Sequence, residues 1–505
     1  MKKNIIYHIA SAAWMLSAVW GLTSCNDFLS ENPNRGDNEP LETKQQVEAL
    51  FNNSQYTQHI ALGSIFSSDD FEMSTDQYSS APYNFDADIL SFYTWGTTDL
   101  INSGTDEVWN DEFNKVFTAN MVIHDIKNVE DATDAERSDY LAQAHFMRAV
   151  AYYELVNLYC MPYSEETKQS LGLPLKTTTS YEEDLSRASL ADTYQFIIAD
   201  LDEAEKTSHT DISKRWLVSR PAVAAMKARL YLNMGDYAHA QEEAEKALQT
   251  TQATLQDYNE LGHHISYAYN MNGEEVEVSY SGLMDMGALE YTDYQEMLYS
   301  GTYKLYTSMR MLPSETLKSL YDQDNDLRYS QFFAKNGSLE YGVEGFGDDM
   351  LYRKFFDVNT YYDILPEGPT VGEMLLVKAE AQCRQGDWQD AINTVNTLRS
   401  KRFAVGSDYL LEVTSQEDAL TKILDERHRE LPFTMRWFDI RRYAFNETTA
   451  DDVTLSRSFY KIENKQADFE QIDDYTLPVK SKRYAQPLPQ TEISRSNGQL
   501  KQNEY

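Results

Sequence analysis

The sequence predicts a mostly α-helical fold in which a repeated helical scaffold carries a large irregular lobe. Two distant segments of similar sequence, residues 222–248 and 372–398, space their small and apolar residues as paired helices do. Residues 261–370 lie between them and lack sustained helical periodicity. The chain has 505 residues, of which 42% are apolar and 12% aromatic, and this is ample for one large core or two ordinary ones.

The N-terminus has the layout of an export signal. Two lysines are followed by an apolar run from Ile5 to Leu22. A transmembrane anchor is the alternative, because this run is close to the shortest length that spans a bilayer, but it contains His8 and is followed at once by turn-forming residues. The pattern therefore predicts a signal peptide over residues 1–24.

Cys25 is predicted to be the point of lipid attachment. Residues 22–25, Leu-Thr-Ser-Cys, resemble a bacterial lipobox, in which the cysteine receives a diacylglycerol and becomes the first mature residue. Several acyl chains, at about 0.8 kcal/mol per buried CH₂, hold a protein on a bilayer far more firmly than one chain does. An ordinary secretory signal with a chance cysteine is the alternative. Residues 25–45 carry Pro, Gly, Asn and acidic residues, which predict a flexible tether.

The two similar segments have the pattern of tetratricopeptide repeats. In each, a glycine suited to a left-handed helix end, Gly235 or Gly386, precedes an aspartate that can cap the next helix. Small residues then recur at three-to-four spacing, which lets the two helices pack closely. Residues 141–159 and 190–207 are two further candidate units, so the predicted repeats are not contiguous.

Charge and cysteine usage exclude several classes of protein. The 44 Lys and Arg against 81 Asp and Glu give a net charge of −37, so a nucleic-acid backbone would be repelled. With Cys25 assigned to lipid, Cys160 and Cys383 are too few for a disulfide framework. A disulfide between them is the alternative, but each lies in an apolar helical stretch, so we expect two buried free thiols.

No motif in the sequence indicates catalysis, a cofactor or a metal. We find no nucleophile elbow, no phosphate-binding loop and no zinc-binding H-E-x-x-H pattern. The run Asp-Gln-Asp-Asn-Asp at 322–326 has calcium-like spacing, yet it lacks the loop glycine, and Phe333 occupies the twelfth position where glutamate is needed. We therefore expect a solvated loop there and a protein without catalytic residues.

Five blocks in order resemble the SusD/RagB lipoproteins of the Bacteroidetes outer membrane. They are RAVAYYELVNLYCMPY with GLPL (148–163 and 172–175), the first repeat from Arg220, VKAEAQCRQGDWQDAINTVNTLRSKR (377–402), ILDERHRELPFTMRWFDIRRY (423–443) and the ending QPLPQTEISRSNGQLKQNEY (486–505). Two positions depart from the family pattern. Cys160 replaces a usual glycine, and Phe433-Thr434-Met435 replaces a phenylalanine-acid-glycine step.

The resemblance implies a function and a location. Family members sit on the cell surface, anchored to the outer membrane by lipid, as a lid over a SusC-like TonB-dependent transporter, and pass captured nutrient to it. Most studied members bind glycans, whereas RagB-type members handle peptides, and neither is an enzyme. A glycan-binding lipoprotein is thus the favoured interpretation. The alternatives are a peptide-capturing subunit and a lipidated glycoside hydrolase.

The predicted parts of the chain follow from the repeats and the resemblance. They are a signal peptide (1–24), a lipidated tether (25–45), an N-terminal helical region with repeat units (46–260), an irregular ligand-binding insertion (261–370) and a C-terminal region with the last repeat unit and the tail (371–505). In the fourth block, arginines at 427, 429, 436, 441 and 442 alternate with Glu426, Glu430 and Asp439. We interpret these charges as a structural lock made of charge-assisted hydrogen bonds.

The resemblance places the ligand on loops at about 66–105 and within 261–370. Flat rings beside carboxylate and amide groups are the chemistry that a neutral sugar needs. Trp95 is the leading candidate, because its ring is interleaved with such groups. The other candidate glycan-binding residues are Asn102, Asp69, Asp70, Tyr83, Tyr93, Tyr269, Tyr291 and Tyr294. Trp109 lies in a stretch that resembles a packing helix, so we predict it to be in the core.

Overall fold

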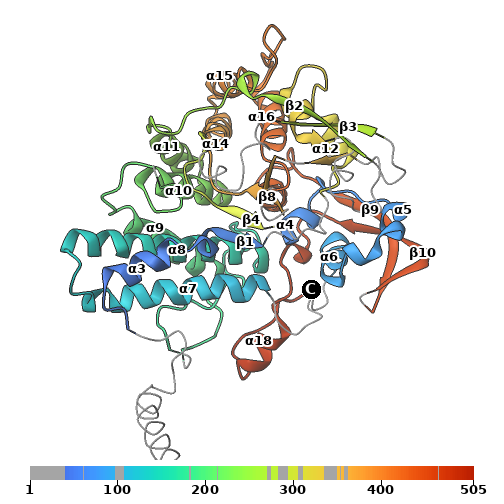
Figure 1. Ribbon diagram of the computed structural model, residues 1–505. Coiled ribbons are helices and arrows are strands. Elements are labelled where there is room, and N and C mark those ends of the chain that lie inside the picture. The colour runs from blue at the N-terminus through green and yellow to red at the C-terminus, as the bar shows by residue number, and fades with distance from the viewer. Residues whose placement is uncertain are drawn as a thin grey trace, which may run out of the picture.

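The computed structural model is a helical body from which two β-hairpins project (Figure 1). It describes residues 40–505 except 61, 97–106, 181–182, 213, 270–274, 282–293, 305–310, 335–349, 353, 358–361 and 465. The helices are α3 (Lys44–Phe51), α4 (Leu62–Ser67), α5 (Thr75–Ser80), α6 (Ala87–Tyr93), α7 (Glu107–Asp125), α8 (Asp134–Tyr159), α9 (Leu190–Ala204), α10 (Arg220–Met234), α11 (Tyr237–Ala247), α12 (Glu315–Ser319), α13 (Leu327–Phe332), α14 (Val371–Arg384), α15 (Trp388–Arg399), α16 (Gln416–Glu430), α17 (Arg436–Tyr443) and α18 (Gln490–Arg495).

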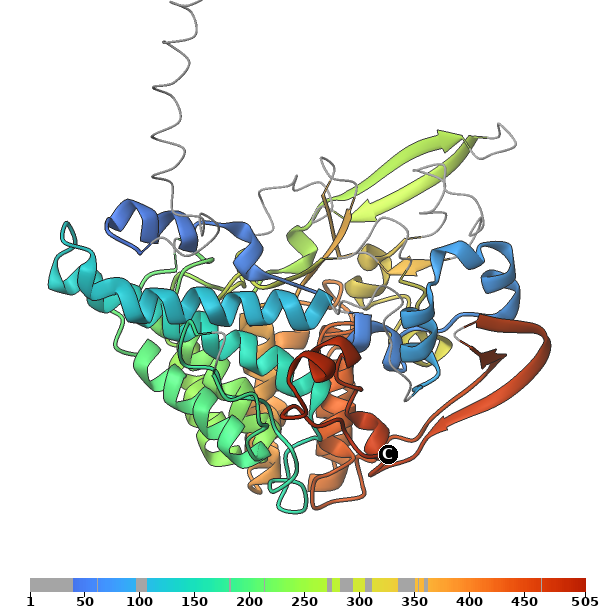
Figure 2. The same cartoon turned by 90° about the horizontal axis from the view of Figure 1, so that it is seen from below.

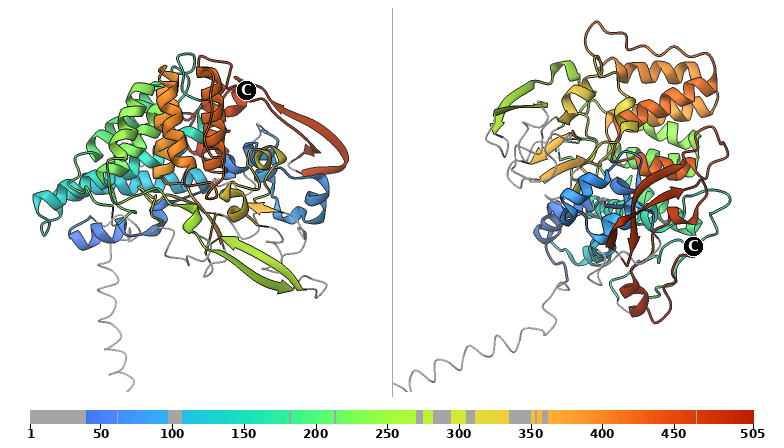
Figure 3. Two further views of the ribbon diagram at one scale, coloured as in Figure 1. Left: turned by 90° about the horizontal axis from the view of Figure 1, so that it is seen from above. Right: turned by 90° about the vertical axis from the view of Figure 1, so that its right-hand side faces the viewer.

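The predicted repeat pairs are present as antiparallel helix hairpins. α10 packs against α11 and α14 against α15, and α11 contacts α14, so the two units stack on each other (Figure 3). Gly235 ends α10 with φ of 73°, and Gly386 follows α14 with φ of 104°, a conformation that glycine adopts without a steric penalty. These findings confirm the mostly α-helical scaffold and the repeats expected from 222–248 and 372–398.

The other helices of the scaffold pack in the same manner. The long α8 lies between α7 and α9 and thereby forms the candidate unit at 141–159. Its first turn is closed by a capping box, in which the Thr133 side chain accepts from the backbone of Glu136 and Glu136 accepts from the backbone of Thr133. A second cap begins α10, where Ser219 is the N-cap and Pro221 lies inside the first turn. Local sequence thus sets the helix boundaries.

The strands are short and join distant segments. They are β1 (Gln58–Ile60), β2 (His263–Tyr269), β3 (Glu275–Ser281), β4 (Thr302–Lys304), β5 (Phe333–Ala334), β6 (Leu351–Tyr352), β7 (Phe355–Asp357), β8 (Tyr362–Pro366), β9 (Leu455–Glu463) and β10 (Gln466–Leu477). A four-stranded sheet has the order β1-β4-β8-β7, with β1 and β4 parallel. The other three sheets are the two-stranded pairs β2–β3, β5–β6 and β9–β10.

The described parts of 261–370, a stretch expected to be irregular, contain short strands and the short helices α12 and α13. The β2–β3 hairpin extends away from the helical body on one side, and the longer β9–β10 hairpin extends past α5 and α6 on another (Figure 2). The Gly-rich piece at 342–349 lies outside the described residues.

At 322–326, Asp322 accepts hydrogen bonds within an exposed turn, whereas Asp326 is buried and pairs with Arg328 at 2.8 Å.

The described chain begins with packed residues slightly ahead of the expected end of the tether. Leu41 is buried in a cluster with Val47 and Phe51, and α3 starts at Lys44, capped by Thr43. The predicted signal peptide, Cys25 and most of the tether lie outside the described residues. Among the helices of residues 40–505 that are described, none combines the length and apolar character needed to cross a membrane.

The two remaining cysteines are buried and free, as expected. Cys160 ends α8 and Cys383 lies in α14. Burial raises the pKa of the Cys160 thiol and raises that of Cys383 to about 11. Both side chains therefore remain protonated at neutral pH.

Candidate ligand-binding site

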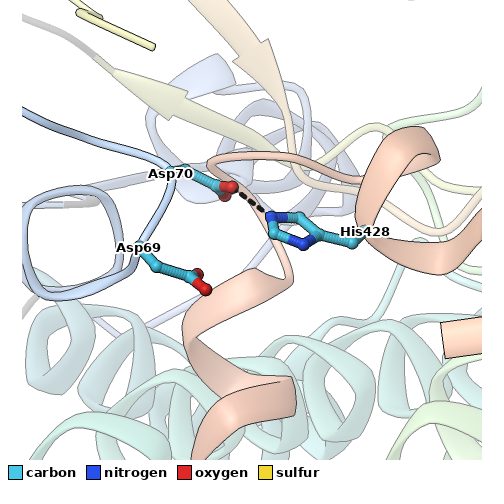
Figure 4. A group of neighbouring side chains, drawn as sticks. All are labelled: Asp69, Asp70 and His428. Atoms are coloured by element: carbon cyan, nitrogen blue, oxygen red, sulfur yellow. Dashed lines mark hydrogen bonds and ion pairs between the residues drawn. The ribbon is translucent and has the colours of Figure 1, made fainter. Parts of the chain in front are cut away.

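Asp70 joins the N-terminal segment to the fourth sequence block. One of its carboxylate oxygens lies 2.5 Å from His428 Nε2, and the other accepts a hydrogen bond from the backbone N–H of Phe433 at 2.7 Å (Figure 4). Phe433 has φ of 62°, so its amide is presented by a left-handed turn that a non-glycine residue rarely adopts. Asp70 therefore holds this turn in place.

Asp69 forms a bidentate ion pair with Arg436. The two carboxylate oxygens accept from Nε and Nη2 of the guanidinium, both at 2.6 Å. Burial alone would raise the pKa of Asp69, but Arg436 outweighs it and the pKa is well below the usual range. Such a bidentate pair is strong and geometrically specific.

The Asp69, Asp70 and His428 side chains are also the group of described residues whose potential metal-ligating atoms lie within 4.8 Å of one another. The donor set does not fit a metal ion. Asp70 and His428 already bond to each other, and the Arg436 cation occupies both oxygens of Asp69. We therefore treat these residues as a clasp between chain segments, and Asp69 and Asp70 do not offer free carboxylates to a sugar in this structure.

Trp95 is part of the core, contrary to the expectation that its ring faces ligand. It is 1% exposed, has φ of 53°, and its indole N–H donates to the Ser67 carbonyl at 3.0 Å. Arg457, from β9, covers it, with the guanidinium carbon 4.7 Å from the Trp95 ring and 4.1 Å from the Tyr93 ring. A sugar could reach the Trp95 face only if Arg457 left it.

Tyr93 and Tyr294 are buried as well. The Tyr93 hydroxyl donates to the Met73 carbonyl at 3.1 Å, and the Tyr294 hydroxyl lies 3.1 Å from that of Tyr258. Tyr83 differs from both, because its side chain is 72% exposed at the short helical turn Pro82–Asn84. Tyr83 is therefore available, and the candidates whose side chains are described do not share one exposed face.

The other candidates are only partly described. Tyr269 lies on β2 opposite Glu275 of β3, which places its backbone in the projecting hairpin. Asn102 and Tyr291 lie outside the described residues.

A pocket that the sequence did not suggest lies beside α7. Its volume is about 330 Å³, and its walls are α7, residues between 174 and 180 together with Leu185, and the C-terminal residues Glu492 and Leu500. Trp109 is 6% exposed and contacts Phe113 and Tyr159, which confirms the expected core position. The same ring nevertheless forms part of the pocket wall. The spacing of Trp109 and Phe113 on α7 was the only hint of the pocket in the sequence, because the opposite wall comes from segments distant along the chain.

Four of the five arginines predicted to lock the fourth block form ion pairs: Arg427 with Asp439, Arg429 with Glu426, Arg436 with Asp69 and Arg442 with Glu380. Arg441 differs, because its guanidinium donates to the backbone carbonyls of Tyr484 and Cys160.

Further buried ion pairs join this block to other segments. Arg402 binds Glu430 and Glu296, Arg328 binds Glu430 and Glu426, and Arg442 binds Glu380. We call this set the Arg–Glu network; its pairing distances are 2.6–2.8 Å. Burial would raise the pKa of Glu430, but Arg402 and Arg328 outweigh it and lower the pKa to about 2. Within the network, Arg328 links α13 to α16 and Arg442 links α17 to α14. Arg427 on α16 also pairs with Asp439 on α17 at 2.8 Å, so these ion pairs together lock the four helices of the scaffold.

A second buried cluster lies between β1, a strand of the four-stranded sheet, and helices α7 and α8. Its members, the His59 cluster, are His59 on β1, Glu112 and Lys115 on α7, and Glu154 on α8. His59 Nδ1 is 2.8 Å and Lys115 Nζ is 2.7 Å from one oxygen of Glu112. The pKa of Glu154 is raised to about 8, mainly by burial and further by the nearby carboxylates of Glu367 and Glu112. The Glu154 Oε1 atom is buried and has no hydrogen-bond partner in the described structure.

Comparison with known families assigns most of the chain. The sequence profile of the SusD family matches residues 287–505, and the profile described as "Starch-binding associating with outer membrane" matches residues 27–232. Among curated proteins, SusD-like protein P38 of Formosa agariphila is 23% identical over 400 residues, which cover 68% of this chain and 75% of the relative.

Solved structures share the fold. A SusD superfamily protein from Bacteroides thetaiotaomicron superimposes with a TM-score of 0.66 at 18% identity, covering 92% of this chain and 100% of that one. A surface glycan-binding protein A from Bacteroides uniformis has a TM-score of 0.63 at 15% identity, covering 91% and 99%. A SusD-like carbohydrate binding protein from Bacteroides vulgatus has a TM-score of 0.58 at 16% identity, covering 91% and 97%.

Proposed function

Because this chain belongs to the SusD/RagB family, we propose that it is a surface lipoprotein that captures oligo- or polysaccharide and delivers it to a SusC-like TonB-dependent transporter. The observation that carries this proposal is the match of two family profiles in chain order over residues 27–232 and 287–505. Two proteins of the same fold are described as glycan-binding or carbohydrate-binding, which favours saccharide over peptide.

The proposed protein binds without catalysis and is anchored by lipid at Cys25, facing the cell exterior. The outer-membrane description of one matching profile supports this location. The acidic net charge of −37 is compatible with a neutral ligand and opposes nucleic acid. If Cys25 carries the anchor, Cys25→Ala protein should leave the outer-membrane fraction in cells that lack the transporter. Persistence of that protein in the fraction would contradict the anchor.

The ligand face in this proposal includes Tyr83, with Asn102, Tyr269 and Tyr291 as further candidates on neighbouring loops. The exposed Tyr83 ring can stack on the apolar face of a sugar at little cost to stability, because 72% of its side chain already contacts solvent. Trp95, Tyr93, Tyr294, Asp69 and Asp70 act in the proposal as supports of that region, because each is held by the interactions given above.

An array that presents both glycans and peptides tests the function. We expect glycan signals, and we expect Tyr83→Ala to weaken the strongest signal about fivefold or more, as loss of one stacking ring does. Tyr505→Ala is the matched control, because Tyr505 is also an exposed tyrosine, at 45%. Signals from peptides alone would contradict glycan capture. Release of reducing sugar that disappears on changing one carboxylate would contradict a purely binding role.

A further inference from the structure

The pocket beside α7 combines an aromatic wall with polar groups. Trp109 and Phe113 are one helical turn apart and both line the cavity, and Asn110 and Asn114, also one turn apart, line it next to them. The facing wall contributes Thr178. In Figure 2, α18 lies beside the end of α7 where these residues are placed. The pocket volume of about 330 Å³ falls in the range of small-molecule sites.

Three asparagines on α7 are used in different ways. Asn120 is buried, donates to the carbonyls of Lys176 and Thr178, and accepts from Arg148, so its amide is fully engaged in the fold. The amides of Asn110 and Asn114 make no hydrogen bond to the described residues, and both line the pocket. Two amides one turn apart, each able to donate and accept, are therefore left for a ligand.

The charge around the pocket favours an uncharged ligand. Lys176 and Glu492 both line it, so neither sign dominates. Lys176 is 3.9 Å from Glu183, and Glu492 is paired with Arg495 at 2.8 Å. An anionic or cationic ligand would meet a like charge on one wall, whereas a neutral hydroxylated ring would not.

We propose that this pocket is a second saccharide-binding site, which takes one or two neutral sugar units. Phe113 and the small part of Trp109 that reaches the pocket wall supply apolar contact for the C–H face of the sugar, and Asn110, Asn114 and Thr178 supply hydrogen bonds to its hydroxyls. The inference rests on the proposed function. It uses none of the residues in 66–105 or 261–370, where the resemblance places the ligand.

The second site gives the protein two contacts with one polysaccharide chain. Two weak sites on one scaffold raise the apparent affinity for a polymer that reaches both, while the affinity for a short sugar stays that of each site alone. Polysaccharide binding should consequently be tighter than disaccharide binding.

Ligand-observed NMR with maltose, cellobiose, lactose and xylobiose at millimolar concentration tests the site. We expect at least one disaccharide to bind, and the double variant Asn110→Ala with Asn114→Ala to weaken its binding about tenfold, because two hydrogen bonds to ligand are lost. Asn128→Ala is the matched control, since Asn128 is an exposed asparagine at the far end of the α7 segment and is not in the pocket. It should bind as the wild type does, and circular dichroism confirms that each variant is folded.

The outcomes separate this inference from the proposed function. If the wild type binds array glycans but the double variant binds every disaccharide as tightly as the wild type does, the second site is wrong and glycan capture stands. The same conclusion follows if none of the four disaccharides binds while polysaccharide does. If the wild type binds no glycan on the array, the proposed function fails, and the second site fails with it. Disaccharide binding that survives Tyr83→Ala but weakens in the double variant supports the second site.

Discussion

Glu430 in the Arg–Glu network and Glu154 in the His59 cluster are both buried, yet their pKa values move in opposite directions. Glu430 accepts from two arginines, and its pKa falls to about 2. Glu154 accepts one hydrogen bond, from the Tyr303 hydroxyl at 3.3 Å, and its pKa rises to about 8. Burial penalises the charge of both groups, so direct contact with a cation decides the sign. A buried carboxylate stabilises this fold only where cationic side chains contact it directly.

The largest expected effect comes from removing a partner in the complete network. Arg402→Met leaves Glu430 and Glu296 without one of their cations, so we expect the free energy of unfolding to fall by about 3–5 kcal/mol. Urea denaturation measures it. Arg495→Met is the control, because Arg495 forms an exposed pair with Glu492 and should change stability by less than about 0.5 kcal/mol. Similar losses in both variants would contradict the contrast between the two kinds of ion pair.

Asp70→Asn tests the clasp, and we expect a loss of stability smaller than that of Arg402→Met. The amide keeps the shape but loses the charge-assisted bonds to His428 and to the Phe433 N–H, so we expect a loss of about 2–3 kcal/mol. Limited proteolysis should also cut the segment around residues 66–95 sooner. The exposed Asp76→Asn is the matched change on the neighbouring α5. Equal protection of the wild type and the Asp70 variant would show that the clasp does not hold the segment.

Glu154→Gln should stabilise the protein, and the gain should depend on pH. Below a pH of about 4.5 both the folded and the unfolded chain keep the Glu154 proton. Between about 4.5 and 8 the unfolded chain releases it while the folded chain retains it, so the wild type loses stability as pH rises through this window. We expect the variant to gain about 1–3 kcal/mol at pH 8 and little near pH 4.5.

Thermal unfolding of the wild type and Glu154→Gln at both pH values measures this gain. Glu430→Gln is the opposite case. The folded pKa of Glu430 lies below its unfolded value, so its stabilising effect is present above about 4.5 and is lost only as pH falls toward about 2. That variant should therefore be less stable than the wild type at pH 5 and at pH 8 alike. An equal shift for Glu154→Gln at every pH would show that its carboxyl does not titrate in this range.

The parts of the fold that local sequence determines were predictable. Gly235, Gly386 and the aspartates after them mark helix ends within a few residues, so the repeat pairs could be found without a structure. A lock within the fourth block was predictable because arginines and acidic residues alternate there, but the partners Arg328, Arg402, Glu296 and Glu380 lie outside that block and were not predicted. The strand pairs were not predictable, because β1 at residues 58–60 pairs with β4 at residues 302–304, far along the chain, and three-residue strands carry almost no pattern of their own.

In the candidate site, too, local features were predictable and long-range contacts were not. Trp95 looked like an exposed ring in a loop, but Arg457 covers it from a strand far along the chain, and no local pattern indicates that contact. Asp69 and Asp70 looked like free acids, but their partners, Arg436 and His428, are equally remote in sequence. Trp109 was placed in the core from its helix, and the pocket beside it depends on Thr178 and Leu500. Local sequence shows which chemical groups a residue offers, whereas long-range packing decides whether a ligand can reach them.

The buried thiols of Cys160 and Cys383 have a practical consequence. Both are enclosed by the helical scaffold and remain protonated at neutral pH, so they react slowly with maleimide or iodoacetamide reagents. A chain that begins after Cys25 therefore has no readily labelled native cysteine among its described residues. One cysteine introduced at an exposed position, such as Val405 at 88% exposure, would carry a single fluorophore. A single label can thus be placed on the protein without removal of either native cysteine.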